Sequence, residues 1–353
     1  MLWWAAVGAF FVALQAYIYI SWYVSGDVHR IPTGVTPVPG YMKGFVFAQQ
    51  IIFPVALVLM LYFIVIRPWR REGTATVDGL IFLAFGTVVW QDPLISYFSP
   101  SYTYNSAFWN LGSWAGHIPG WQSANPDGIA NPVIWEMGCY LVMFLGGLYI
   151  GSNLMKRAKN RFPRLPIPLL IAGTFVFYFI VDLIMEGSWM RTGAYVYAGS
   201  MPGFTISWGN YYQFPVQEAL FVGVIWTGWA CVRYFRDDRG RTVVERGIDR
   251  LRVRPTQKVA LRFLAFAGIF NVVFLAGYNI PWQWFSLQGE WPKDIMERSY
   301  FTNGVCGDGT TYACPAHEIP MNKGDRSVRI APDGTLVIPP GVTPPQNIKH
   351  KTE

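Results

Sequence analysis

Long stretches without charged residues alternate with short, strongly basic loops along this chain, and this alternation limits the folds open to it. Only 14% of its 353 residues are charged, whereas soluble domains carry about 25%. A helix needs roughly 20 apolar residues to cross a bilayer. Stretches of that kind lie at 3–24, 44–66, 77–98, 133–154, 167–187, 214–235 and 259–280. The pattern predicts an all-α membrane protein, a bundle of about seven transmembrane helices.

The basic residues distinguish the two faces of the membrane. Most of the 28 Lys and Arg lie in the loops after the second, fourth and sixth stretches, and the alternate loops hold only Arg30, Lys43 and Arg191. Loops rich in Lys and Arg stay in the cytoplasm. We therefore expect a plasma-membrane protein with a cytoplasmic N-terminus, a first helix that is retained, and an extracytoplasmic C-terminus. The basic residues form no stripe outside these loops, so we expect no nucleic-acid partner.

The composition divides the chain into two regions. Residues 1–287 hold the helical bundle, and the outer loops 99–132 and 188–213 are rich in Trp, Tyr, Asn, Gly and Pro. These loops are expected to form a structured cap over the bundle. Residues 288–353 are polar and rich in Pro and Gly, which predicts a mostly irregular extracytoplasmic tail.

Two shorter segments carry expectations of their own. Residues 328–340 predict a small hairpin around Asp333 and Gly334, because strand-forming residues flank a turn dipeptide. Residues 282–287 are too short to span the membrane. Their tryptophans favour the membrane interface, where we expect this segment to lie.

Acidic residues inside or at the ends of the apolar stretches are the main chemical signal. They are Asp92, Glu136, Asp182, Glu186 and Glu218. A carboxyl group in hydrocarbon is costly and normally faces the bundle interior or a wet cavity. The predicted topology places all five in the outer half of the bundle, where the spans hold no Lys or Arg. Carboxyl groups gathered at low dielectric cannot all ionise, so a neutral acid comes to lie beside a carboxylate base, as acid–base catalysis requires.

These acids are the candidate catalytic residues, and aromatic residues at the same level are expected to stabilise a cation formed by protonating an apolar substrate. Other polar and aromatic side chains near this level are candidates for substrate binding. They are Tyr104, Asn105, Trp114, His117, Tyr178, Tyr212 and Gln213.

Other interpretations of the acids stay open. Acids at the ends of spans can lie in the headgroup region, where they cost little, and this applies above all to Asp92 and Glu136. The acids can also bind a polar head without forming a bond, which would make the chain a non-catalytic lipid- or sterol-binding or transport accessory protein. A proton-coupled transporter ranks lower because no internal repeat is visible. Self-association and membership of a membrane complex are both open.

The four cysteines predict one disulfide and no metal centre. Cys306 and Cys314 lie in the expected extracytoplasmic tail, where disulfides persist, and we expect them to pair. Zinc binding by these two with His317 fits no standard ligand spacing. Cys139 and Cys231 lie within spans and are expected to pack there. The sequence holds no nucleotide-binding loop or nucleophile elbow, so we expect neither a metal nor another cofactor.

A set of motifs spread over the chain is shared with a known family. They are RPWRRE (67–72), QDP (91–93), YTYNS (102–106), GSW (112–114), IPGW (118–121), YQFPVQE (212–218), RYFRDDRG (233–240) and ERSYFT (297–302). Together they resemble the avermectin spirocyclase (AveC-like) family of actinobacterial membrane proteins. The resemblance runs from the first span into the tail.

The resemblance implies a cyclase or dehydratase activity. The family's namesake closes a dihydroxy ketone polyketide into a spiroketal and can also dehydrate the product. Relatives occur where no such polyketide is made, so polyketide-, terpenoid- and lipid-like substrates all stay open. The Phe-Pro-x-x-Glu element at 214–218 is also similar to small membrane cyclases of carotenoids and meroterpenoids, which protonate their substrates with carboxylic acids.

The hypothesis from the sequence is therefore a cofactor-independent cyclase or dehydratase. Asp182 or Glu218 would donate the proton, and the other of the two, or Asp92, would act as the base. The expected partners are a lipophilic small-molecule substrate and the surrounding membrane lipids.

Overall fold

Apolar stretches with few helix breakers form the long helices of this protein. The computed structural model describes residues 1–343, and the last ten residues of the expected tail lie outside the described residues. The helices are α1 (Leu2–Ser25), α2 (Gly40–Met60), α3 (Arg67–Glu72), α4 (Val77–Phe85), α5 (Val133–Arg161), α6 (Ile167–Trp189), α7 (Val216–Tyr234), α8 (Pro255–Phe274), α9 (Ile280–Ser286), α10 (Lys293–Met296) and α11 (Ser299–Thr302). The predicted all-α membrane class is confirmed.

Strands are short and lie outside the helical bundle. They are β1 (Thr103–Tyr104), β2 (Tyr195–Val196), β3 (Thr205–Ile206), β4 (Phe214–Pro215), β5 (Arg329–Ile330) and β6 (Leu336–Val337). Each pairs antiparallel with one other strand: β1 with β2, β3 with β4, and β5 with β6. The last pair confirms the hairpin predicted around Asp333 and Gly334.

Within residues 1–343, six helical stretches are long and apolar enough to cross a membrane. They are Leu2–Ser25, Gly40–Glu72, Val77–Ser96, Val133–Arg161, Ile167–Thr192 and Pro255–Ser286. The remaining expected span corresponds to α7, which is not among the six. Its 19 residues include Gln217, Glu218 and Arg233. α7 packs against both α5 and α6, and most of its side chains are buried.

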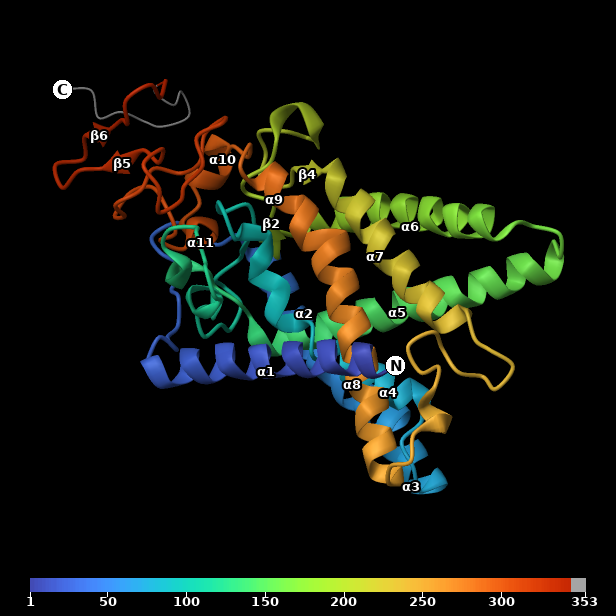
Figure 1. Cartoon of the computed structure of the whole chain (residues 1–353). Coiled ribbons are helices and arrows are strands. Elements are labelled where there is room, and N and C mark those ends of the chain that lie inside the picture. The colour runs from blue at the N-terminus through green and yellow to red at the C-terminus, as the bar shows by residue number, and fades with distance from the viewer. Residues whose placement is uncertain (344–353) are drawn as a thin grey trace.

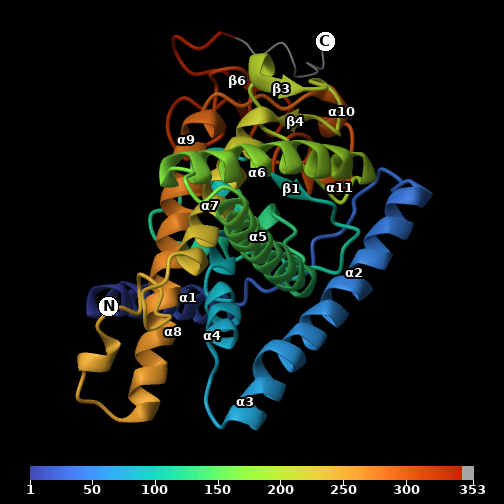
Figure 2. The same cartoon turned by 90° about the vertical axis from the view of Figure 1, so that its right-hand side faces the viewer.

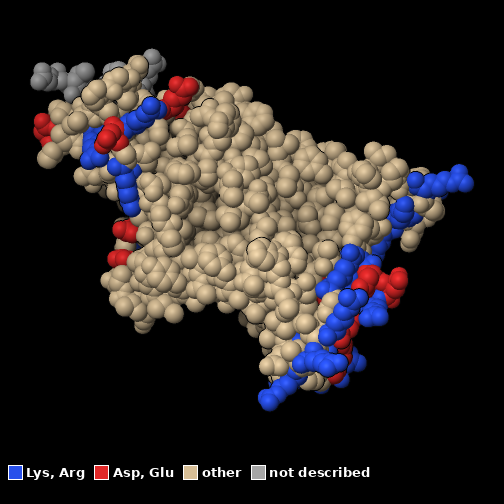
Figure 3. Space-filling view, in the orientation of Figure 1, with Lys and Arg blue, Asp and Glu red and all other residues tan. Residues whose placement is uncertain are grey.

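The outer surface of the bundle is apolar, as hydrocarbon requires. On α2, for example, Phe47 is 65% exposed and Ile52 is 55% exposed. The face shown in Figure 3 has its charged side chains gathered at two opposite ends, with a broad band between them that is free of charge. This distribution matches two membrane–water interfaces on either side of an apolar layer.

Small residues let the helices approach closely. α1 crosses α8 at Gly8 and Gly268, where an added Cβ would lie 1.8 Å from the Leu264 carbonyl oxygen and 2.3 Å from that of Trp4, respectively. α5 and α6 form an antiparallel hairpin, with α7 running beside both, whereas α2 leans outward at the edge of the bundle (Figures 1 and 2). Contacts of this kind are typical of membrane bundles.

The third span is broken, where the sequence predicted a regular crossing. α4 ends at Phe85, and the chain continues through Gly86 into a 3₁₀ helix, Val89–Ser96, which contains Pro93. Asn271 of α8 meets the polar groups of the break: it donates to Thr87 Oγ1 at 3.0 Å and accepts from the side-chain nitrogen of Gln91 at 2.8 Å. Irregular backbone at membrane depth is tolerated when protein buries it in this way.

The expectation for residues 282–287 is wrong. α8 continues through a π-helical turn, Leu275–Asn279, directly into α9. Pro281, at the start of α9, has no backbone N–H to donate within the helix, and a widened turn accommodates that loss. Trp282 is buried, and its indole donates to Ser101 Oγ at 3.0 Å. The segment therefore completes a long helix and does not lie along the membrane surface.

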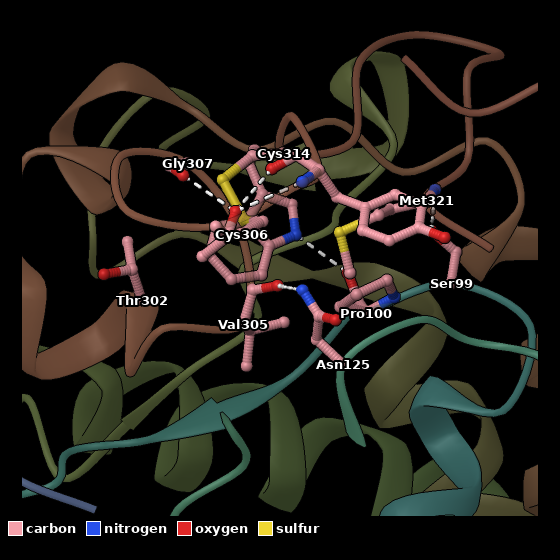
Figure 4. The surroundings of a disulfide bond; sticks show 12 residues. Ser99, Pro100, Asn125, Thr302, Val305, Cys306, Gly307, Cys314 and Met321 are labelled. Atoms are coloured by element: carbon pink, nitrogen blue, oxygen red, sulfur yellow. Dashed lines mark hydrogen bonds between the residues drawn. A yellow bond between two sulfur atoms is a disulfide. The ribbon is translucent and has the colours of Figure 1, made fainter. Parts of the chain in front are cut away.

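The outer loops and the described part of the tail form a packed cap at the end of the bundle opposite α3 (Figure 1). Cys306 and Cys314 form a disulfide. Beneath it, Asn125 from the first outer loop donates to the Val305 carbonyl at 3.0 Å, and the Met321 amide donates to Ser99 Oγ at 3.2 Å (Figure 4). The tail is thus tied to the outer loops by side-chain contacts.

Candidate active site

A cavity of about 120 Å³ lies where the broken third span, α5, α6, α7 and the end of α8 meet the cap. Four of the five candidate catalytic acids line it: Asp92, Asp182, Glu186 and Glu218. Helix geometry explains part of this convergence, because residues four apart on α6 share one face. The rest depends on the break after α4, which brings Asp92 to the same space.

Three carboxyl groups form one wall of the cavity. Asp182 and Glu186 lie one turn apart on α6, and Glu218 lies in the first turn of α7. One oxygen of each lies within 4.8 Å of the others. Among the described residues, no donor points at Oδ2 of Asp182. Asp182 instead lies beside Glu186, within reach of a shared proton.

Tyrosine hydroxyls hold the other two acids of this wall. Tyr195 and Tyr197 both donate to Oε1 of Glu186, at 2.9 and 2.6 Å. Tyr278 donates to Oε2 of Glu218 at 2.7 Å. Hydrogen bonds to a carboxylate favour its charged form, so these contacts favour a negative charge on Glu186 and Glu218 over one on Asp182.

A second carboxyl centre comes from the broken third span and α5. Oδ1 of Asp92 accepts from Tyr104 at 2.7 Å and from Tyr140 at 2.5 Å. The side-chain nitrogen of Asn131 donates to Oδ2 at 2.7 Å and lies 3.1 Å from Oε2 of Glu136. Glu136 is fully buried but does not line the cavity, so it forms a layer behind Asp92. Protein buries both side chains, so neither acid contacts lipid headgroups.

The cap tyrosines stay protonated over a wide pH range. Burial raises the pKa of Tyr104 well above its ordinary value, and the Asp92 carboxyl raises it further. Burial followed by the charge of Glu186 does the same for Tyr195 and Tyr197. These hydroxyls are therefore fixed hydrogen-bond donors and do not act as bases.

The remaining walls are aromatic. The rings are those of Tyr102, Trp135, Phe144, Trp189, Trp226 and Phe274. Among the described residues that line the cavity there is no Lys, Arg or His. Aromatic faces attract cations, and the attraction is strongest where water is excluded. The cavity therefore combines proton donors, proton acceptors and a lining suited to a short-lived positive charge.

The same acids are the residues that could hold a cation. Carboxylate oxygens are the ligands that Mg²⁺ and Ca²⁺ take in proteins, and Asp182, Glu186 and Glu218 lie close enough together to share one. Tyrosine hydroxyls donate to one oxygen of Glu186 and one oxygen of Glu218, and the other oxygen of each can accept a proton or bind a cation. The arrangement fits carboxyl groups that share protons.

The structure places the candidate substrate-binding residues in different parts of the protein. Tyr104 lines the cavity, and the other six are not among its described lining residues. Asn105 donates to the Gly193 carbonyl, and Gln213 donates to the Tyr197 carbonyl, so both hold cap loops together. The Tyr178 hydroxyl donates to the carbonyl of Gly147, which joins α6 to α5.

The other three candidates lie farther into the cap or on its surface. Trp114 is buried between Tyr19 and Trp22 of α1, and its indole donates to the Trp90 carbonyl. His117 contacts Ser21 and Asp27 at the end of α1. The ring of Tyr212 lies against the guanidinium of Arg191.

Sequence reasoning missed most of the tyrosines that touch the acids. Tyr140 lies one helical turn after Glu136, a spacing that places both on one face of α5. Tyr195 and Tyr197 alternate along an extended segment, so they point to the same side. No local sequence pattern identified Tyr278 as a site residue, because the π-helical turn is what brings it to Glu218.

The comparison with protein families decides the classification. The family described as "Spirocyclase AveC-like" matches residues 69–301, about two thirds of the chain. The protein belongs to the AveC-like spirocyclase family. Neither the curated proteins nor the solved structures include a match to the chain. Membership in this family indicates a cyclase-type role. The matched residues include the 3₁₀ helix of the third span and helices α5 to α8, which contribute to the cavity lining.

Proposed function

We propose that this AveC-like protein is a membrane cyclase, or a dehydratase, that uses carboxylic acid–base chemistry on a lipophilic polyketide-, terpenoid- or lipid-like substrate. The main support is the meeting of two carboxyl centres, one from α6 and α7 and one from the broken third span, in a single aromatic cavity. An acid and a base that line the same cavity can act on one substrate held there.

The hydrogen bonds suggest how the acids divide the work. Asp182 has an oxygen that no described donor contacts and lies beside Glu186, which two tyrosines hold. Asp182 is thus suited to carry the proton, whereas Glu218, whose charged form the Tyr278 bond favours, is suited to act as a second carboxylate base. Asp92 accepts three hydrogen bonds and is suited to be the carboxylate base.

The proposed reaction begins with a hemiketal formed from a hydroxy ketone. The acid protonates the hemiketal hydroxyl, the C–O bond breaks, and water leaves with the bonding electron pair. The oxocarbenium ion that remains is captured by a second hydroxyl of the substrate, whose proton passes to the carboxylate base. The net change is the loss of one water per spiroketal formed. If the base removes a neighbouring C–H proton instead, the product is an alkene.

The test is mass spectrometry of lipophilic extracts from cells that express the protein, lack it, or carry Asp182→Asn or Glu218→Gln. A general acid or base typically contributes about 10²–10⁴-fold to rate, so each variant should lose turnover on that scale while protein levels stay normal. A precursor heavier than the product by one water should accumulate. Asp127→Asn, at an exposed position in the cap, is the matched control.

Other results would change the assignment. Full activity in both Asp182→Asn and Glu218→Gln would remove these residues from the site. Unaltered molecules that merely shift between cells and medium would favour the alternative, a lipid- or sterol-binding or transport accessory protein. A chelator such as EDTA should leave cyclisation unchanged, because the proposed steps use only protons. Activity lost on chelation and restored by Mg²⁺ would contradict that.

A further inference from the structure

The cap closes the aqueous side of the cavity. Asn303 from the tail donates to the Tyr104 carbonyl at 2.9 Å, directly behind the residue that lines the cavity. Trp291 and Trp282 donate to Pro100 and Ser101, and both indoles are fully buried. A substrate that entered through this cap would have to break these buried hydrogen bonds, and each buried polar group left without a partner costs about 1–3 kcal/mol.

The lining residues differ in how exposed they are, and this difference indicates another route by which a substrate can enter the cavity. The lining residues from the broken third span, from β2, and from α7 and α8 are buried. The partly exposed ones come, with the exception of Tyr102, from α5 and α6. They are Cys139, Tyr140 and Met143 of α5 and Met185, Glu186 and Trp189 of α6. The partly exposed part of the lining therefore follows the seam between these two helices, which we define by Cys139, Met143, Met185 and Trp189.

The same two helices carry exposed apolar residues, which we call the rim and which include Ile134, Ile150 and Ile184. Ile134 and Ile150 of α5 are 50% and 54% exposed, and Ile184 of α6 is 63% exposed. No Lys or Arg occurs in α5 before residue 156 or anywhere in α6. An apolar rim on a span that crosses the membrane faces hydrocarbon. The seam thus leads into the bilayer and not into water.

The size of the cavity limits how much of a substrate it can hold. An engineered cavity of about 150 Å³ in another protein holds a benzene molecule. The 120 Å³ cavity here therefore accommodates one ring-sized group. The remainder of a larger lipophilic molecule must extend through an opening, and the seam is the opening that continues into an apolar medium.

We propose that the seam between α5 and α6 is the substrate's lateral entrance and the binding groove of its apolar chain. The reacting end, with its oxygen functions, lies among the acids while the chain remains at the bilayer. This inference rests on the proposed function for what happens inside the cavity, but not for the opening itself. It restricts the substrate to molecules with a compact oxygenated end and a long apolar part.

The residues along the seam suit a gate. Met143 and Met185 are unbranched and polarizable, so they adapt to chains of different shape. Trp189 is held from outside by α2: it stacks on Phe53 at 6.1 Å and meets Phe45 edge-on at 6.1 Å. Trp189 is therefore the fixed side of the opening, and the two methionines are its adjustable side.

The seam can be tested without a known substrate. The purified full-length chain is reconstituted in phosphatidylcholine vesicles in which a fraction of the lipid carries a diazirine in one acyl chain. Illumination generates a carbene that inserts into neighbouring side chains, and mass spectrometry locates the labelled residues. We expect label on Cys139, Met143 or Met185 in addition to the exposed rim residue Ile184.

Substituted proteins provide the matched comparison. Met143→Trp together with Met185→Trp should fill the seam and lower the label at Cys139 several-fold. Ile184→Trp, which adds the same ring one residue away on the lipid-facing side, should leave the label at Cys139 unchanged. Label confined to rim residues such as Ile134 and Ile184 in the unsubstituted protein would overturn the proposal, even if the tryptophan variants fail to fold.

The labelling does not depend on turnover, so the two proposals can fail separately. Label in the seam together with normal product from Asp182→Asn would remove the catalytic assignment and leave the lateral opening. Loss of product in Asp182→Asn without label in the seam would leave the cyclase and remove the lateral entrance.

Discussion

The acids of the cavity differ in the number of tyrosine hydroxyls that donate hydrogen bonds to them. Two point at Glu186, one at Glu218 and two at Asp92. Among the described residues, Asp182 has no such donor on Oδ2. Since a hydrogen bond to a carboxylate favours its charged form, the protonated carboxyl group is expected at Asp182. Chemically identical side chains can thus take different roles because their donors differ.

Removing one donor from Asp92 should destabilise the carboxylate form in which this residue acts as the proposed base. In Tyr104→Phe, Asp92 keeps its bonds to Tyr140 and Asn131 but loses the 2.7 Å bond to the hydroxyl. A hydrogen bond to a charged group contributes about 1.5–3 kcal/mol, so we expect cyclisation to slow by roughly ten- to a hundredfold. Tyr312→Phe, in the tail, is the control. Equal rates for Tyr104→Phe and the unsubstituted protein in the extract assay would exclude Asp92 as the base.

The free energy of unfolding at alkaline pH should depend on the buried cap tyrosines. Burial and the neighbouring Glu186 raise the pKa of Tyr195 and Tyr197 well above its ordinary value. Above about pH 10 the unfolded chain releases these protons while the folded protein keeps them, so the free energy of unfolding should fall as pH rises through this range. Below about pH 10 both states hold the protons, and these residues make no pH-dependent contribution.

Ultraviolet absorbance of tyrosinate measures this directly. In guanidinium chloride, Tyr197→Phe should show one tyrosinate fewer than the unsubstituted protein on titration. In the folded state the two titration curves should coincide until unfolding begins. A difference between the folded proteins near pH 10 would mean that Tyr197 ionises in the native cap and is not a fixed donor.

Among the elements, the helices were more predictable than their irregularities. Hydropathy and length located the long spans because both depend on local composition. The break after Phe85 was not predicted, since Asn271, 180 positions beyond Gln91, satisfies its polar groups. The continuation of α8 through residues 282–287 was missed because an aromatic-rich segment suits the interface as well as the buried position that Trp282 occupies.

In the candidate site, too, features set by local composition could be predicted and features set by long-range contacts could not. The acids could be selected from sequence because carboxyl groups inside apolar stretches are rare, and four of them line the cavity. All the proposed binding residues except Tyr178 came from loops, whose folding depends on long-range contacts. Asn105 and Gln213 consequently hold the cap together, and Trp114 packs on α1, away from the cavity lining.

The close approach of α1 and α8 predicts that a larger residue at Gly268 lowers the stability of the protein. In Gly268→Ala the new methyl group would lie 2.3 Å from the Trp4 carbonyl oxygen and 2.9 Å from the Gly8 nitrogen. Both are backbone atoms, so the helices must separate, at an expected cost of about 1–3 kcal/mol. Thermal unfolding in detergent should show a lower midpoint for this variant.

Gly146 of α5 provides the matched control. A Cβ there meets no atom within 4 Å, and alanine is favoured over glycine inside a helix by about 1 kcal/mol. Gly146→Ala should therefore leave the unfolding midpoint unchanged or raise it. If both alanine variants behave alike, close packing at Gly268 does not limit stability.

For the whole molecule, charge and covalent chemistry suggest one orientation. The longest basic loops lie at the α3 end of the bundle, whereas the disulfide lies in the cap at the opposite end (Figures 1 and 3). Basic loops stay in the cytoplasm, and disulfides persist outside it. His117 of the cap contacts the last turn of α1, so the start of α1 lies toward the other side. We therefore propose a cytoplasmic N-terminus and an extracytoplasmic tail in the plasma membrane.

Protease protection tests this orientation. Intact cells, with any outer wall permeabilised, carry the protein with a different epitope at each terminus. External protease should remove the C-terminal epitope and leave the N-terminal one until the membrane is lysed. Cys306 and Cys314 should remain joined in protein alkylated before lysis. Loss of the N-terminal epitope in intact cells, with a protected tail, would invert the topology and place the cap, with the acids of the cavity beneath it, on the cytoplasmic side.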